Sequence, residues 1–292
     1  MKTTGLFVVH NYTIPIGYGK PIRLVFFGDV HRDSPHNADG KWKEFLAYAK
    51  GLKNAWFVGM GDYLDSTSSS ERSAWALACM QLHETKKEDV EKHEVAKCGL
   101  FAKEIAFMKG RLVGLIGGNH YFNFQNGTNS DQKICEKLEC KFLGVSSFVR
   151  LTLESCGRHH TLDLWLHHGA GGARLVGGSI NKVDQMREHA EADIYAMGHD
   201  HGRMVVPAKP RMRLSHSSGG NGSCLKVKER QQWLLRTGSF LSSYVDGTAS
   251  YNVDAARGPS SLGHVELEIT VSKNDRSEDV EDRGAITIRG IA

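Results

Sequence analysis

Short apolar runs that stop at glycine constrain the fold of this chain more than any other feature. The runs Ile22–Phe27, Ala55–Val58 and Arg111–Ile116 are rich in branched and aromatic residues, and a glycine follows each. Continuous apolar runs of this length are typical of strands buried on both faces. Between the first two lies Lys41–Leu52, whose apolar residues recur at helical spacing. This alternation predicts an α/β fold.

The rest of the chain continues the pattern. Residues 66–110 turn rich in Glu, Lys and Ala, which predicts two or three helices that form a lid-like insertion. Further expected elements are a helix near 129–140, strands at 142–153 and 161–166 with a turn at 157–160, a glycine-rich loop at 169–178, a helix around 180–190, and strands at 193–197, 232–235 and 264–271. We expect Ser215–Ser223 to form a mobile loop, and the last apolar residues to be an edge strand or poorly ordered.

Domain organisation follows from the absence of an internal repeat or linker. We expect a single domain over residues 1–292, with a motif-bearing core at 22–202 and a C-terminal β elaboration at 203–292.

Composition excludes several protein classes. The chain is 40% hydrophobic and 24% charged, which excludes disorder of the whole chain. No apolar stretch reaches the ~18–20 residues of a membrane-spanning helix. The N-terminal residues have no cleavage site of a secretory signal, so we expect a first strand there and a cytoplasmic protein. The six cysteines form no CxxC pair, which argues against a zinc ribbon or redox motif.

Polar side chains follow the ends of five predicted strands. They are Asp29-Val30-His31 after Gly28, Asp62 after Gly61, Asn119-His120 after Gly118, His167-His168 after Leu166, and His199-Asp200-His201 after Gly198. Ligand sites in α/β sheets lie outside the carboxyl ends of strands, and glycine allows the tight turns needed there. We therefore expect these side chains to meet at one edge of the fold.

The residue types in this set indicate a pair of metal ions. Carboxylate, amide and imidazole ligands suit borderline divalent cations, so we expect Mn first, with Fe, Zn or Mg as alternatives. One carboxylate can bridge two cations, and two cations ~3.5–4 Å apart can clamp the attacking and leaving oxygens of a phosphoryl transfer. Such cations acidify a water molecule into a hydroxide nucleophile, while a further histidine protonates the leaving oxygen.

The order and approximate spacing of these motifs resemble the calcineurin-like metallophosphoesterase superfamily. The resemblance implies a two-layer mixed β-sandwich flanked by helices, with a dinuclear centre. It places one cation on Asp29, His31 and His201, and the other on Asn119, His199 and one of His167 and His168. It also implies that Asp62 bridges the two cations and that His120 is the catalytic proton donor.

This sequence departs from the family pattern at two places. Tyr121 stands where an acidic residue usually follows the Gly-Asn-His motif, so another group must orient His120, for which Asp65 is the candidate. Ser66-Thr67 stands where protein phosphatases have Arg-Gly, which argues against a phosphoprotein phosphatase. Of the two adjacent histidines, we favour His168 over His167 as the ligand.

Other residues have less specific roles. Arg32 and Arg174 are candidate phosphate ligands, although solvated loop charges are the alternative. Trp75, Leu82 and Phe101 are expected in core or lid packing, and His83, His93, His159 and His160 at the surface. The loop 168–182 and the segment Thr237–Phe240 resemble a phage- or prophage-type, DNA-repair-exonuclease-like branch of the superfamily.

The sequence therefore predicts a metal-dependent phosphoric ester hydrolase that acts on a phosphate mono- or diester. DNA is one candidate substrate, because segments 203–213 and 226–236 carry Lys and Arg, although the net charge of +4 is modest. A small phosphoester under the 66–110 lid is the other. The alternative function is a metal-stabilised, non-catalytic binding or scaffold protein, and the oligomeric state is open.

Overall fold

The computed structural model describes residues 8–171, 175–219, 222–247, 253, 258–272 and 286–292. Over these residues the chain is a mixed α/β protein. The helices are α1 (Asp39–Gly51), α2 (Arg72–Gln81), α3 (Glu84–Glu104), α4 (Ser130–Leu138) and α5 (Val176–His189), with a 3-10 turn at Ala106–Met108. The strands are β1 (Val9–Pro15), β2 (Ile22–Phe27), β3 (Ala55–Gly59), β4 (Leu112–Leu115), β5 (Ser146–Ser155), β6 (Arg158–His167), β7 (Ile194–Met197), β8 (Arg203–Pro207), β9 (Arg211–Gly219), β10 (Gly222–Arg230), β11 (Trp233–Thr237), β12 (Val265–Val271) and β13 (Ile286–Ile291).

Two sheets pack face to face. One has the strand order β1-β5-β6-β7-β11-β8, and the other has the order β13-β12-β2-β3-β4. Their inner faces share one apolar core, to which both sheets contribute side chains. Strand β5 shows why: its side chains alternate between the two faces of the sheet, and Val149, Leu151 and Leu153 all point into this core.

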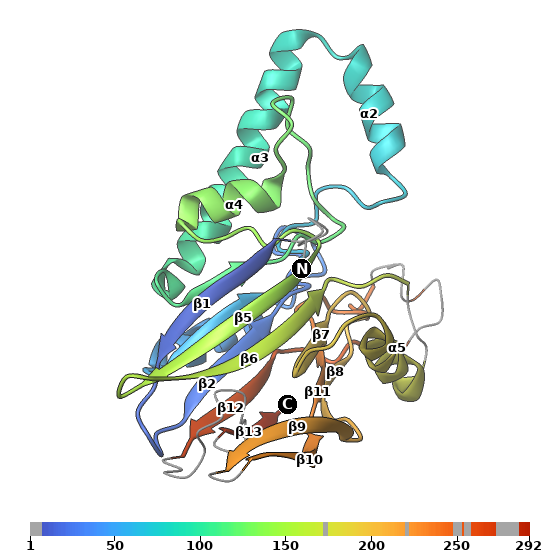
Figure 1. Cartoon of the computed structure of the whole chain (residues 1–292). Coiled ribbons are helices and arrows are strands. Elements are labelled where there is room, and N and C mark those ends of the chain that lie inside the picture. Colours follow the sequence, from blue (N-terminus) through green and yellow to red (C-terminus); the bar gives the residue numbers. More distant parts are fainter. Residues whose placement is uncertain (1–7, 172–174, 220–221, 248–252, 254–257, 273–285) are drawn as a thin grey trace.

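Helices cover the outer faces of both sheets (Figure 1). On the five-stranded sheet, α1, α3 and α4 bury one stripe each, including Trp42, Phe101 and Ile134. On the six-stranded sheet, α5 buries Val183 and Met186. The molecule therefore has the layer order helix, sheet, sheet, helix.

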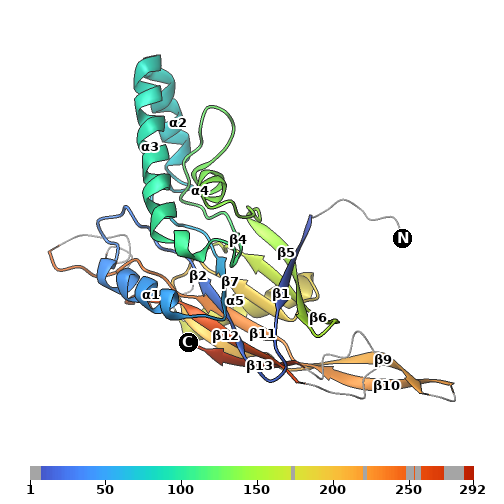
Figure 2. The same cartoon turned by 90° about the vertical axis from the view of Figure 1, so that its left-hand side faces the viewer.

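Helices α2 and α3 extend beyond the sandwich as an arm (Figures 1 and 2). The C-terminal half of α3 is anchored in the core by Cys98, Phe101 and Ala102. Helix α2, by contrast, has no buried residue, although its sequence is largely apolar. The expected insertion at 66–110 is thus helical, and its outer helix packs only lightly on the rest of the protein.

Parallel pairing brings the predicted site loops to one end of the sandwich. Strands β2, β3 and β4 are parallel neighbours, as are β6 and β7. The carboxyl ends of parallel neighbours lie at the same edge of a sheet. Each of these five strands ends within a few residues of a predicted ligand.

Most predicted elements are confirmed within a few residues, but three predictions are wrong. Ser215–Ser223 belongs to the antiparallel hairpin of β9 and β10, apart from residues 220–221, which lie outside the described residues. His159 and His160 lie in β6 rather than in a turn. The glycine-rich loop is shorter than expected because α5 already begins at Val176. In the first two cases pairing with a neighbouring strand supplies backbone hydrogen bonds to a polar segment.

The C-terminal residues 286–291 form β13, an edge strand on β12, while 273–285 lie outside the described residues. Among the described residues, no helix combines the length and apolar character required to cross a bilayer.

Candidate metal centre

Left-handed backbone conformations are concentrated at the predicted ligands. Seven described residues other than glycine have positive φ, and five of them are Asp29, His31, Asp62, His199 and His201, with φ between 44° and 71°. Each such residue costs of order 1–3 kcal/mol, which surrounding structure must supply. Strained backbone of this kind occurs typically at functional sites.

The first group of ligand atoms comes from Asp29, His31 and His201. Their candidate ligand atoms all lie within 4.8 Å of one another. The carboxylate of Asp29 is completely buried and accepts the backbone N–H of His199 through both oxygens, at 3.2 and 2.9 Å. Its Oδ1 lies 3.8 Å from His201 Nε2. These three residues are the predicted ligands of one cation, and the structure brings them together.

The second group consists of Asp62, His168 and His199, whose ligand atoms also lie within 4.8 Å of one another. Asn119 joins them, since its Oδ1 is 2.8 Å from both His168 Nε2 and His199 Nδ1. The structure therefore gathers the second predicted ligand set as well, with His168 in it. His167 instead accepts the N–H of Gly169 through its Nδ1, at 2.8 Å.

The tautomer of His168 follows from its other ring nitrogen. Nδ1 lies 2.8 Å from the carbonyl oxygen of Met60, which can only accept, so Nδ1 carries a proton. In the neutral ring Nε2 then presents a lone pair. This lone pair faces Oδ1 of Asn119 at 2.8 Å and Oδ2 of Asp62 at 3.1 Å. A backbone carbonyl that orients a metal-binding histidine in this way is common at metal sites.

Asp62 lies between the two groups. Its Oδ1 accepts the backbone N–H groups of Asn119 and His120, at 2.6 and 2.9 Å. Its Oδ2 is 3.1 Å from His168 Nε2 and 3.7 Å from His31 Nε2. One oxygen is therefore held by backbone, and the other faces a histidine of each group.

The donor set fits divalent cations. His31 is buried; its Nδ1 faces Asp65 Oδ1 at 3.3 Å, whereas its Nε2 has no hydrogen-bond partner. A buried polar atom without a partner is costly, so it points to a ligand. Carboxylate, amide and imidazole groups that converge around such atoms match the preferences of Mn, Fe or Zn.

The pKa values of the histidines differ with their surroundings. Burial lowers the pKa of His201 to about 3 and that of His199 to about 4, and the neighbouring histidines contribute. Both rings are therefore neutral and able to bind a metal near pH 7. Burial also lowers the pKa of His168, but the Asp62 carboxylate outweighs it and raises the pKa to about 10. A cation between these groups would take the place of that proton.

The pKa values of the buried carboxyl groups shift in opposite directions. Burial raises the pKa of Asp29 to about 7, and burial also raises the pKa of Asp131 to about 7. Burial on its own would raise the pKa of Asp62, but His168 and His31 hold this pKa well below its usual value. Of these three carboxyl groups, that of Asp62 is therefore the one that stays ionised near pH 7.

His120 is paired with Asp65 beside the first group. Its Nδ1 lies 2.7 Å from Asp65 Oδ1, and its ring meets that of His31 edge-on at 4.7 Å. Burial raises the pKa of Asp65, but hydrogen bonds from His120 and His31 lower it well below the usual range. The structure thus brings Asp65, the candidate partner of His120, into hydrogen-bond contact with its ring.

Glycines at the strand ends allow the side chains of Asp62 and His168 to lie close to the neighbouring backbone. A Cβ on Gly118 would lie 2.0 Å from Asp62 Oδ1, and one on Gly61 would lie 2.5 Å from His168 Nδ1. Gly118 N–H in turn donates to Asp131 Oδ2 at 2.9 Å, which ties this turn to α4. Any larger residue at either glycine would displace a ligand.

Several supporting residues were not predicted from the sequence. Arg236 in β11 is fully buried and donates to the carbonyls of Gly198 and Ser179 at 2.8–3.0 Å. It also pairs with Asp200 at 3.2 Å, which holds the loop that carries His199 and His201. The sequence feature that could have identified Arg236 is that it is a single arginine inside an otherwise apolar strand.

The segment after β11 supports Asp29 as well. Ser239 Oγ and the N–H of Phe240 both donate to the carbonyl of Asp29, at 3.0 and 2.9 Å. Residues more than 200 positions away in the chain thus hold the strained backbone of Asp29 in place.

The predicted phosphate-binding arginines are not part of the two groups. Arg32 pairs with Glu104 at 2.9 Å and Asp39 at 3.0 Å and donates to Asn37, so its guanidinium joins α1 to α3. Arg174 lies outside the described residues. Arg72 of α2, which was not predicted, donates to the carbonyl of Asn119 at 2.5 Å and stacks on the Tyr121 ring at 4.2 Å.

Comparisons with known proteins add little. No family model and no curated protein matches this chain. Among solved structures it is similar to a double mutant of Vps29 from Entamoeba histolytica, with 11% identity and a TM-score of 0.36 over 92% of this chain and 98% of that one. At this identity and TM-score the likeness carries no conclusion about function.

Proposed function

We propose that this chain is a dinuclear, metal-dependent phosphoesterase with the fold and mechanism implied by its resemblance to the calcineurin-like superfamily. The position of Asp62 carries the proposal. Its Oδ2 faces His31 of one ligand group and His168 of the other, at 3.7 and 3.1 Å. A carboxylate oxygen that faces an imidazole of each ligand group is the arrangement that a bridged pair of divalent cations needs.

Asp29, His31 and His201 would hold one cation, and Asn119, His168 and His199 the other, with Asp62 shared. When bound, the cations would supply Lewis acidity toward the phosphate and lower the pKa of an attacking water molecule. Only Asp29 and Asp62 bring negative charge to these ligand sets, so the loaded centre would keep net positive charge for an anionic substrate.

His120 would protonate the leaving oxygen. Asp65 accepts from Nδ1, so Nε2 is the atom available for proton transfer. The side chain of His120 is 24% exposed and thus reachable by a substrate, whereas that of His31 is 3% exposed. We assign His31 to metal binding and His120 to acid catalysis on this difference.

Two classes of substrate are compatible with the proposed function, namely small phosphoesters and DNA. The Lys- and Arg-bearing segments considered for DNA lie in β8, in the β9–β10 hairpin and in β11, whose Arg236 is buried. Strand β8 leads away from His201 toward that hairpin (Figure 1). This separation favours a small phosphoester over a long nucleic acid. DNA remains the second substrate to try.

The test is Mn-dependent hydrolysis of bis-p-nitrophenyl phosphate and p-nitrophenyl phosphate by wild type, Asp62→Asn and Asp184→Asn. Asp184 lies on the surface of α5 and serves as the matched control carboxylate. We expect Asp62→Asn to lose at least 100-fold in rate and one or both metal ions, and Asp184→Asn to behave as wild type.

A protein that binds two equivalents of metal but hydrolyses neither compound, nor single- or double-stranded DNA, would be the metal-stabilised scaffold instead. Metal analysis of protein purified without chelator separates this outcome from failure to bind metal.

A further inference from the structure

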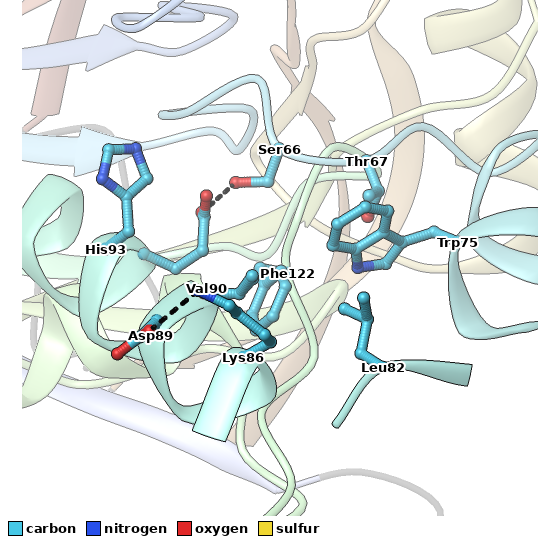
Figure 3. A pocket seen from close by; sticks show the side chains of 10 residues that line it. Ser66, Thr67, Trp75, Leu82, Lys86, Asp89, Val90, His93 and Phe122 are labelled. Atoms are coloured by element: carbon cyan, nitrogen blue, oxygen red, sulfur yellow. Dashed lines mark hydrogen bonds and ion pairs between the residues drawn. The ribbon is translucent and has the colours of Figure 1, made fainter. Parts of the chain in front are cut away.

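A cavity of about 520 Å³ lies under the arm, between α2, α3 and the segment that follows His120. Figure 3 shows Trp75 and Leu82 on one side, Val90 and His93 of α3 on the other, and Phe122 between them. A cavity of this size holds a compact organic group, since sites for small molecules typically measure ~300–1,000 Å³.

The wall of this cavity is continuous with the proposed acid. Ser66 follows Asp65 directly, and its N–H donates to the carbonyl of His120 at 3.2 Å. Thr67 Oγ1 donates to the carbonyl of Tyr121 at 2.8 Å. Two residues of the cavity wall therefore pair with the backbone of the segment that carries the proposed acid, so the cavity adjoins that segment.

The lining is chiefly apolar, and its ionised groups have partners. Glu94 accepts from Ser66 Oγ at 2.7 Å and pairs with Lys97 at 2.8 Å. Lys86 lies 4.0 Å from Asp89. Trp75 is 37% exposed although it lines the cavity. Such a half-covered tryptophan next to apolar walls favours a hydrophobic or aromatic ligand over a charged one.

We propose that this cavity binds the apolar leaving group of the substrate, so that the enzyme prefers phosphoesters of bulky apolar alcohols or phenols. This inference rests on the proposed function. In the reaction, water forms the new P–O bond and the bond from phosphorus to the leaving oxygen breaks. His120 gives a proton to that oxygen, and the attacking water loses a proton to solvent, so the products are the free alcohol or phenol and the phosphate.

The test uses 4-alkylphenyl phosphates, as monoesters and as methyl diesters, with alkyl groups from methyl to butyl. Para-alkyl groups barely change the acidity of the phenol, so the series varies apolar bulk alone. We expect kcat/KM to rise about fourfold per methylene until the cavity is filled, from the transfer free energy of a CH2 group.

Trp75→Ala and Leu82→Ala should flatten this dependence on chain length, because they should lower kcat/KM more for the butylphenyl esters than for the unsubstituted phenyl esters. Leu77→Ala and Met80→Ala are the matched controls, because both residues lie on α2 and are 64% and 75% exposed outside the cavity. Both controls should keep the wild-type dependence. Helix α2 has no buried residue, so none of these variants should unfold the protein.

Calorimetric titration with 4-butylphenol measures binding in the cavity directly, without any turnover. Binding by wild type and its loss in Trp75→Ala are expected. Turnover that is independent of alkyl length, or a dependence that survives in Trp75→Ala and Leu82→Ala, overturns the leaving-group assignment while the phosphoesterase stands. Absence of all metal-dependent turnover overturns the proposed function and this inference with it, even if 4-butylphenol binds.

Discussion

Asp65 Oδ1 lies 2.7 Å from Nδ1 of His120 and 3.3 Å from Nδ1 of His31. One carboxylate thus contacts both the proposed acid and a proposed metal ligand. Asp65 comes three residues after Asp62, and it takes over the position that Tyr121 leaves without an acidic side chain. In the proposed function, this pairing would link proton transfer by His120 to the metal centre.

Replacing Asp65 by Asn should lower kcat about 100-fold, because the His120 ring would lose the anion that sets its tautomer and orientation. Metal content should be unchanged, since Asp65 belongs to neither predicted ligand set. The double variant with His120→Asn should be no slower than His120→Asn alone, because residues that act as a unit are not additive. If the losses in kcat of the two single variants were instead additive in the double variant, Asp65 and His120 would act independently, which would contradict this pairing.

The metal-free protein should become less stable as pH rises from 7.5 to 9. The pKa of His168 is raised to about 10 in the folded chain, against ~6.5 when unfolded. The folded chain then keeps a proton that the unfolded chain has lost. This stabilisation is complete below pH 6.5 and disappears as pH rises through 10, with a slope of up to ~1.4 kcal/mol per pH unit.

His168→Asn should abolish this slope, and His167→Asn is the matched control that should keep it. Added Mn²⁺ should stabilise the wild type more at pH 9 than at pH 7.5, because the ion replaces the His168 proton. Urea unfolding in EDTA and in Mn²⁺ measures both effects. An unchanged slope in His168→Asn would assign the pH dependence to another group.

Arg236→Met should destabilise the protein by ~3–5 kcal/mol, because Asp200 would be left buried without its cation. Manganese affinity should fall too, since Arg236 holds the loop between Gly198 and His201. A second change, Asp200→Asn, should restore part of the stability by removing the unpaired charge. Urea unfolding and metal titration of both variants check this, and a neutral Arg236→Met would contradict it.

Arg32→Ala should lower stability on the order of 1 kcal/mol and leave KM unchanged, because the guanidinium pairs with Glu104 and Asp39 rather than facing the ligands. Arg72→Ala should instead lower kcat about tenfold, since Arg72 holds the carbonyl of Asn119. Steady-state kinetics of the two variants provide the comparison. A tenfold rise in KM for Arg32→Ala would contradict this prediction and indicate that Arg32 binds the substrate.

The order of strands, helices and ligand motifs could be predicted from the sequence, because each depends on a local pattern. An apolar run before glycine predicts β2 or β3, and a helical stripe such as that around Trp42 predicts α1, whatever lies elsewhere in the chain. The convergence of Asp29 and Asp62 followed from the rule that parallel strands end at one edge. His199 follows β7 in the other sheet, and it joins them because the two sheets pack face to face.

Contacts between distant segments settled the rest. His168 rather than His167 lies with Asp62 and His199, and the contact of its Nδ1 with the carbonyl of Met60, 108 residues away, holds its ring there. Residues 215–219 and 222–223 are extended because β9 pairs with β10, and Arg236 is buried because it meets Gly198 and Asp200. A local pattern describes which face of an element is apolar, but it holds no information about which distant donor or acceptor will satisfy a polar group. That choice belongs to the packed molecule.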